Sequence, residues 1–189
     1  MNNILWIVQC RTTSSRLPGK VLKKIGDKTM FEHHISKVSE MGHHTVVGVP
    51  CSEPKIEELK EIANQYNVEV YNPHNAERDV LSRFVAIADR FEPEWIIRTT
   101  VDCWDMDTNW CARTISACID SDMPIFNSYK EGSTIEMFKY MDLVRANDEI
   151  GFDEFDMQHR ENVTSYFRKG FEKGSIDTRE ELENARQQR

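Results

Sequence analysis

The chain has 189 residues, a formal net charge of −8 and a hydrophobic fraction of 39%, which suits one domain with a substantial core and argues against wholesale disorder. The acidic balance disfavours long-range attraction to nucleic acid or anionic lipid, and no apolar run approaches the roughly 18–20 residues of a membrane span. The five cysteines form no C-x-x-C pair, and the N-terminus lacks the basic segment of a secretory signal. We therefore expect reduced thiols and a cytoplasmic protein.

Apolar runs typical of strands alternate with amphipathic stretches typical of helices up to Ser128. Strands are predicted at residues 4–10, 45–49, 68–71, 95–99 and 124–127. Helices are predicted at residues 30–41, from a start signal at Ser52 and Pro54 onward, at 76–91 and at 108–119. This alternation predicts an α/β domain with a largely parallel sheet.

Beyond Ser128 the pattern loosens. We expect an extended segment at residues 135–138, short helices at 141–146 and 160–171, and a last helix opened by a capping box of Thr178 and Glu181. No internal repeat, low-complexity tract or Pro/Ser-rich linker interrupts the chain, which predicts a single domain over residues 1–189.

The loop after the first predicted strand is cationic within an acidic chain. Residues 1–26 contain Arg11, Arg16 and Lys20 but neither Asp nor Glu. The first loop of an open α/β sheet commonly meets a phosphate, arginine suits bidentate contact with phosphate oxygens, and Ser14 and Ser15 add hydroxyl donors. The residues alone leave two interpretations open, a triphosphate-binding loop and a solvated basic turn.

Acidic residues follow the strand predicted at residues 95–99. Asp102 stands where open α/β sheets bind ligands, and Mg²⁺ on a nucleotide takes one or two protein carboxylates. Asp107 fits a cap for the next helix better. Asp177, taken alone, is better explained as a turn or cap residue than as a ligand.

Other reactive side chains have plainer interpretations. The pairs His33–His34 and His43–His44 lack an H-E-x-x-H spacing or cysteine partners, so we expect surface or helix-end histidines rather than zinc ligands. Cys111 and Cys118 are expected to share a buried helix face. Cys103 is interpreted as packing, because no histidine is placed in the sequence to activate it.

Six short segments, in order, resemble motifs of the cytidylyltransferases that activate sugar acids, and the branch named for the spore-coat polysaccharide synthesis protein F looks closest. The opening is I-V-Q-C-R at residues 7–11 with S-S-R-L-P-G-K-V-L at 14–22. R-D-V-L-S-R-F at residues 78–84 is similar to D-V-L-x-R-[YF], and R-T-T-V-D-C at 98–103 is similar to R-x-T-G-D-C. The later segments are I-E-M-F at 135–138, R-E-N-V-T at 160–164 and I-D-T-R-E-E-L at 176–182, similar to D-x-E-x-F, R-E-H-V-T and V-D-T-x-E-D-L.

This resemblance implies a three-layer α/β/α, Rossmann-like nucleotide-diphospho-sugar transferase fold with a mostly parallel mixed sheet. It implies a nucleotide-binding half at residues 1–128 and a shortened acceptor-side half at residues 129–189. Sugar-acid cytidylyltransferases are often dimers, so a homodimer is expected by analogy, with CTP and a small anionic acceptor as ligands and with neither nucleic acid nor membrane as a partner.

The resemblance also implies roles for individual residues. Triphosphate contacts are assigned to Arg11, Arg16 and Lys20, with Ser14 and Ser15 assisting. The two carboxylates that carry Mg²⁺ in the family match Asp102 and Asp177. The segment near the nucleobase contains Arg78 and Asp79, and the acceptor side contains Glu136, Arg160 and Glu161.

The chain departs from the family pattern at several positions. Val101 replaces the Gly before the metal carboxylate, where a β-branched residue does not easily adopt a positive φ. Trp104 replaces a Pro, Asn162 replaces a His, and the stretch between Phe171 and Ile176 is shorter than in the family. The nucleotide half is therefore better matched than the acceptor half.

The leading hypothesis is transfer of CMP from CTP to an anionic acceptor with release of pyrophosphate. The acceptor is expected to be a sugar acid or a related precursor of a surface polysaccharide. Two alternatives stay open: a glycosyltransferase that uses Asp105 and Asp107 as a D-x-D metal site, and a catalytically silent nucleotide-binding subunit.

Overall fold

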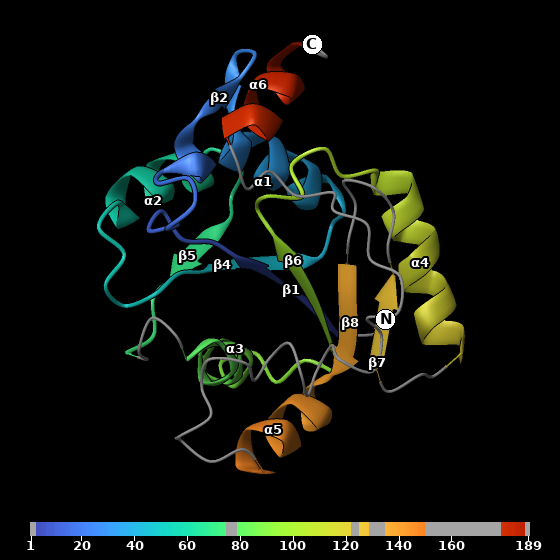
Figure 1. The fold of residues 1–189 in the computed structure, drawn as a ribbon. Coiled ribbons are helices and arrows are strands. Elements are labelled where there is room, and N and C mark those ends of the chain that lie inside the picture. The colour runs from blue at the N-terminus through green and yellow to red at the C-terminus, as the bar shows by residue number, and fades with distance from the viewer. Residues whose placement is uncertain (1–2, 75–78, 122–124, 129–134, 150–178, 188–189) are drawn as a thin grey trace.

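Over the residues that the structure describes, a computed structural model, the fold is a three-layer α/β/α arrangement around a six-stranded mixed sheet in the order β5-β4-β1-β6-β8-β7 (Figure 1). The structure describes residues 3–74, 79–121, 125–128, 135–149 and 179–187. The strands of this sheet are β1 (Ile4–Gln9), β4 (His44–Gly48), β5 (Glu69–Tyr71), β6 (Trp95–Thr100), β7 (Ile125–Ser128) and β8 (Ile135–Lys139). Four of them, β5, β4, β1 and β6, are parallel, whereas β8 is antiparallel to both β6 and β7.

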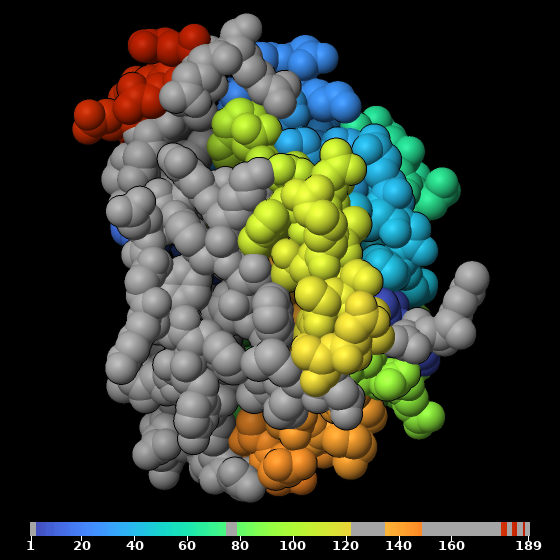
Figure 2. Space-filling view, turned by 90° about the vertical axis from the view of Figure 1, so that its right-hand side faces the viewer, coloured from blue at the N-terminus to red at the C-terminus, as the bar shows by residue number. Residues whose placement is uncertain are grey.

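The helices lie on both faces of the sheet. They are α1 (Met30–Glu40), α2 (Ile56–Asn64), α3 (Val80–Ala88), α4 (Thr108–Ser121), α5 (Tyr140–Glu149) and α6 (Arg179–Gln187). Helices α1, α2 and α4 pack on one face, and α3 and α5 pack on the other. The outer side of α4 faces solvent in Figure 2, where α5 lies below it. Within the described residues, none of the helices combines the length and the apolar character needed to cross a membrane.

Alternating side chains of the central strands explain the two layers. On β1, Trp6 and Val8 point toward α1 and α4, whereas Leu5 and Ile7 point toward α3. All four side chains are at most 1% exposed. A strand buried on both faces reads as a continuous apolar run, which is why the sequence predicted it correctly.

Most predicted elements are confirmed, with shifted ends. Helix α2 begins at Ile56 rather than at Ser52, and α3 begins at Val80 with Asp79 as its N-cap. The helix predicted at residues 160–171 and the capping residue Thr178 lie outside the described residues, although α6 starts at Arg179.

Two features of the topology were not predicted. A hairpin of β2 (Lys24–Ile25) and β3 (Lys28–Thr29) turns at Gly26, whose φ of 67° favours glycine. The extended segment at residues 135–138 is β8, and it lies between β6 and β7 rather than at the edge. Figure 1 shows α6 beside the hairpin of β2 and β3.

The parallel strands bring two loops to one edge of the sheet. Gln9 pairs with Thr100 in the register of β1 and β6, so both strands end side by side. The cationic loop follows β1 and the segment with Asp102 follows β6. The sheet thereby places them together, as open α/β folds do at their ligand sites.

Candidate active site

A cleft opens where β1 and β6 end, with about 650 Å³ of space, a volume that includes open solvent at its mouth. It is lined by Gln9, Cys10, Arg11, Ser14, Ser15, Arg16, Lys20, Val21, Arg98, Thr100, Val101 and Asp102. Six of the residues predicted from the sequence therefore share one cleft: Arg11, Ser14, Ser15, Arg16, Lys20 and Asp102.

The cationic loop is closed by its own backbone. The N–H of Gly19 donates to the carbonyl of Thr12 at 2.9 Å. Gly19 has a φ of 67°, a left-handed conformation that glycine adopts without strain. The short helical turn η1 (Lys20–Leu22) follows directly. This turn directs the buried Lys20 side chain into the cleft.

A buried carboxylate fastens the same loop to the segment after β4. The backbone N–H of Thr12 donates to Oε2 of Glu53 at 2.9 Å, and the Thr12 hydroxyl donates to Oε1. Oε1 also accepts from the N–H of Lys55 at 3.1 Å. Glu53 was not predicted as a site residue. It closely follows an apolar strand in the sequence, but its partner Thr12 lies 41 positions away.

Asp102 is held by the lysine of the opposite loop. Nζ of Lys20 lies 2.9 Å from Oδ2 of Asp102, and the two side chains are 10% and 21% exposed. Burial by itself would raise the pKa of the Asp102 carboxyl, but the Lys20 ammonium and hydrogen bonds lower that pKa below its ordinary value. Asp102 is therefore ionised near neutral pH.

The second oxygen of Asp102 is a candidate ligand atom for a cation. Oδ1 is buried and has no hydrogen-bond partner within the part of the chain that the structure describes. An ionised oxygen without a partner is costly to bury, and a hard cation would satisfy it. The described residues contain no group of three or more His, Cys, Asp or Glu side chains that could bind a metal on its own.

A second polar cluster flanks the cleft on the side of β8. The guanidinium of Arg98 lies 2.6 Å from the Glu136 carboxylate, and both side chains are about one-tenth exposed (12% and 11%). Arg98 also donates from Nε and from a terminal nitrogen to Oε1 of Gln9 at 3.1 and 2.8 Å. Arg98 and Gln9 were not predicted as site residues, although an arginine within a buried strand was an available signal.

The remaining predicted site residues lie elsewhere or outside the described residues. Asp79 is buried and caps α3 by accepting from the N–H of Ser82 at 3.1 Å, and it is not among the residues that line the cleft. Its assignment near the nucleobase stays a prediction. The residues outside the described ranges are Arg78, Arg160, Glu161 and Asp177.

The D-x-D alternative finds no support in the positions of its two carboxylates. Asp105 is exposed and pairs with Nζ of Lys37 at 3.0 Å. Asp107 accepts from the N–H of Trp110 at 2.9 Å at the start of α4, which confirms the predicted cap. Neither residue lines the cleft.

The two departures from the family pattern near Asp102 leave the cleft open. Val101 is not among the non-glycine residues with positive φ, so its β-branched side chain is compatible with this backbone. Trp104 is buried against His33, with ring centroids 5.4 Å apart, and does not line the cleft.

The predicted exposure of His33 and His34 is wrong. His33 is 5% and His34 is 0% exposed, and both lie within α1. His34 is spaced on the helix like the apolar Phe31, Ile35 and Val38, which indicated a core position. The interpretation of the cysteines is confirmed, because Cys103, Cys111 and Cys118 are buried.

Cys10 lines the cleft without being a suitable nucleophile. Burial, followed by the negative charges of Glu53 and Asp102, raises the pKa of its thiol well above the ordinary value. A protonated thiol is a poor nucleophile. The arrangement therefore favours chemistry in which positioned charges act on a bound ligand.

Comparisons with known proteins agree with this geometry. The layers and the sheet define the nucleotide-diphospho-sugar transferase fold, and residues 5–103 match the family model described as cytidylyltransferase. The chain therefore belongs to the cytidylyltransferase family, and it is a CTP-dependent cytidylyltransferase.

Individual relatives are similar over different lengths. The chain is 28% identical over 178 residues to the spore coat polysaccharide biosynthesis protein SpsF of Bacillus subtilis, covering 89% of this chain and 71% of that protein. It is 32% identical over 97 residues to a 3-deoxy-manno-octulosonate cytidylyltransferase of Leptospira interrogans, covering 51% of this chain and 38% of that one. A cytidylyltransferase structure from Leptospira borgpetersenii superposes with a TM-score of 0.81 at 22% identity, covering 98% of this chain and 86% of that one.

Proposed function

We propose that this enzyme transfers CMP from CTP to an oxygen of a small anionic acceptor, a sugar acid or a related precursor of a surface polysaccharide, and releases pyrophosphate. The observation that carries the proposal is the convergence of Arg11, Arg16 and Lys20 with Asp102 in one cleft. A triphosphate offers adjacent anionic groups, and this cleft offers several cations together with one carboxylate.

The cations have distinct tasks in this reaction. The acceptor oxygen attacks the α-phosphorus, and the bond from that phosphorus to the bridging oxygen breaks. Arg11, Arg16 and Lys20 hold the triphosphate and balance the charge that develops on the departing pyrophosphate. Ser14 and Ser15 add hydroxyl donors from the same loop. The reaction needs no covalent bond to the protein, in agreement with the raised pKa of Cys10.

Mg²⁺ fits the donors of this cleft when it arrives with the nucleotide. Asp102, with its unpartnered buried oxygen, would supply a protein ligand, and the proposed second ligand is Asp177. The metal would neutralise phosphate charge during transfer. The Lys20 ammonium already contacts Asp102, so it can donate to that carboxylate and to a phosphate oxygen at the same time.

The acceptor is proposed to bind on the side of β8. Arg98 lines the cleft there and is held by Gln9 and Glu136, so a cation with a fixed orientation faces that part of the site. An anionic acceptor is the natural partner for such a group. Arg160 and Glu161 are proposed to complete this acceptor side, within the half at residues 129–189. The homodimer also stays a prediction.

A screen of pyrophosphate release tests the function directly. The four NTPs with Mg²⁺ are combined with sugar acids, phosphosugars and phosphonates. We expect release with CTP and with an anionic acceptor, and loss of that release in Asp102→Asn. Hydrolysis of a UDP-sugar without pyrophosphate would favour the glycosyltransferase. CTP binding without release for any acceptor would favour the silent subunit.

A further inference from the structure

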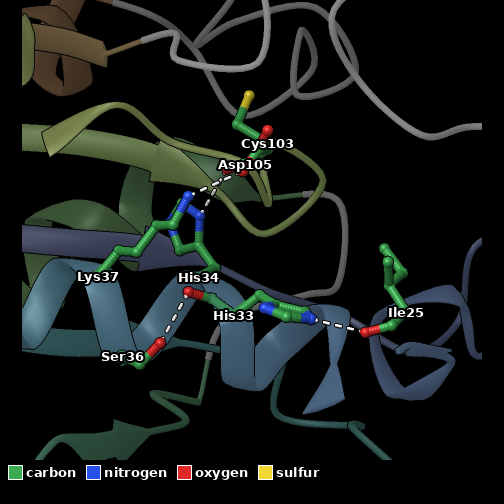
Figure 3. A network of polar contacts seen from close by, with 7 residues as sticks. All are labelled: Ile25, His33, His34, Ser36, Lys37, Cys103 and Asp105. Atoms are coloured by element: carbon green, nitrogen blue, oxygen red, sulfur yellow. Dashed lines mark hydrogen bonds and ion pairs between the residues drawn. The ribbon is translucent and has the colours of Figure 1, made fainter. Parts of the chain in front are cut away.

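Three side chains of α1 contact the segment that follows Asp102. The His34 ring nitrogen Nδ1 lies 2.9 Å from the carbonyl oxygen of Cys103. His33 packs edge-on against Trp104, and Lys37 pairs with Asp105. Figure 3 shows His34 and Lys37 reaching up from the same helix toward this segment. Of these three side chains, His34 is fully buried, and the residue it contacts, Cys103, directly follows Asp102 in the sequence.

A chain of hydrogen bonds defines how His34 is protonated. The indole N–H of Trp6 is only a donor, and it donates to Oγ1 of Thr99 at 2.9 Å. The carbonyl of Cys103 can only accept, so Nδ1 of His34, 2.9 Å away, carries the ring proton and donates to it. In the neutral ring Nε2 is then the acceptor, and the hydroxyl of Thr99, whose Oγ1 lies 2.9 Å away, donates to it. Burial lowers the pKa of His34 to about 4, so the ring is neutral.

The carbonyl of Cys103 is part of the turn that presents Asp102. The N–H of Cys103 donates to the carbonyl of Thr100 at 3.0 Å, which closes the turn around Asp102. The Cys103 residue is thus held at its N–H by the strand end and at its carbonyl by α1. His34 does not line the cleft, so its effect on a ligand acts through this turn.

We propose that His34 is a positioning residue for nucleotidyl transfer: by donating to the carbonyl of Cys103 it fixes the turn that holds Asp102 against the cationic loop. The inference rests on the proposed role of Asp102 in the reaction. Misplacement of a catalytic group by about 1 Å can cost about 10²-fold in rate, so one buried hydrogen bond next to Asp102 is a sensitive point.

Two conservative variants separate the two nitrogens of the ring. His34→Asn places an amide near Nδ1, where it can still donate to Cys103, but it loses Thr99. His34→Gln places an amide near Nε2, where it can still bond Thr99, but it loses Cys103. We expect kcat to fall by about tenfold or more in His34→Gln and by no more than about threefold in His34→Asn, with the KM for CTP changed little in either.

Thermal unfolding and a matched surface variant complete the kinetic test. Each histidine variant loses one buried hydrogen bond, so similar decreases in Tm are expected for both. Lys37→Met removes the exposed ion pair to Asp105 on the same segment and should retain kcat. Equal losses of kcat in the Asn and Gln variants, or losses that follow Tm alone, would overturn the proposal.

Nuclear magnetic resonance of the wild-type protein tests the geometry without activity. Histidine labelled with nitrogen-15 should show His34 protonated at Nδ1 and not at Nε2 at neutral pH. The amide signals of Asp102 and Cys103 should shift in His34→Gln and stay nearly unchanged in His34→Asn. Protonation at Nε2, or equal shifts in both variants, would overturn the proposal even if no acceptor is found and the proposed function fails.

Discussion

Lys20 and Asp102 are 82 positions apart in the chain, yet Nζ of Lys20 lies 2.9 Å from Oδ2 of Asp102. The pair joins the loop after β1 to the turn after β6 across the end of the parallel sheet. It links the cations proposed for the triphosphate to the carboxylate proposed for Mg²⁺. The same contact therefore affects both the stability of the fold and the proposed chemistry.

Removal of Lys20 alone should destabilise the protein more than removal of Lys20 together with the charge of Asp102. Lys20→Met leaves a largely buried carboxylate without its countercharge, and we expect a loss of about 1–3 kcal/mol in the free energy of unfolding. In the double variant with Asp102→Asn, part of that loss should be recovered. Urea denaturation of the four proteins measures the coupling, and additivity within about 0.5 kcal/mol would contradict it.

Neutralising Asp102 should abolish most of the catalytic rate without unfolding the protein. Asp102→Asn keeps the shape of the side chain but removes the charge proposed to bind Mg²⁺, so kcat should fall by about 10²-fold or more. Asp105→Asn is the matched control, because Asp105 is exposed, lies three positions further on and does not line the cleft. Steady-state pyrophosphate release measures both. A larger loss in Asp105→Asn would instead support the D-x-D alternative.

The cationic loop should bind CTP poorly when Glu53 is changed. Glu53→Gln replaces a carboxylate that accepts from Thr12 and Lys55 with an amide that has a single acceptor oxygen. Loss of a hydrogen bond to a charged group costs about 1.5–3 kcal/mol, so the KM for CTP should rise by about 10- to 10²-fold. Glu58→Gln is the control, because its exposed carboxylate pairs with the Lys55 ammonium at 3.6 Å. Equal KM values in both variants would contradict the role of Glu53.

Stability should decrease as the pH falls from about 6.5 to about 4 because of His34. Burial lowers the pKa of His34 from 6.5 to about 4 in the folded protein. Between these values the unfolded chain binds a proton that the folded chain does not, so acid favours unfolding. The full stabilising contribution is present above pH 6.5. Near pH 4 the free energy of unfolding is lower by about 3 kcal/mol.

A comparison with His34→Asn isolates that contribution. The variant lacks the titrating ring, whereas His43, whose pKa is also lowered by burial, is present in both proteins. The stability advantage of the wild type should therefore shrink as the pH falls through this range, as measured by denaturant unfolding at several pH values. A constant difference between the two proteins would contradict the lowered pKa of His34.

Local patterns in the sequence determined the strands, most of the helices and part of the lining of the cleft. An apolar run such as residues 4–9 identifies a strand buried on both faces, and the parallel order implies that loops after such strands meet at one edge. Arg11, Arg16, Lys20 and Asp102 can be identified in this way from the order of residues along the chain. Each belongs to a loop that directly follows a predicted strand.

Only the tertiary structure showed which distant side chains support those loops. The contacts of Glu53 with Thr12, of Arg98 with Glu136 and of His34 with Cys103 join segments from 38 to 69 residues apart. Side-chain periodicity repeats over two to four residues, so it carries no information about such pairings. They depend on strand order and on the insertion of β8 beside β6, which result from packing the whole chain around one sheet.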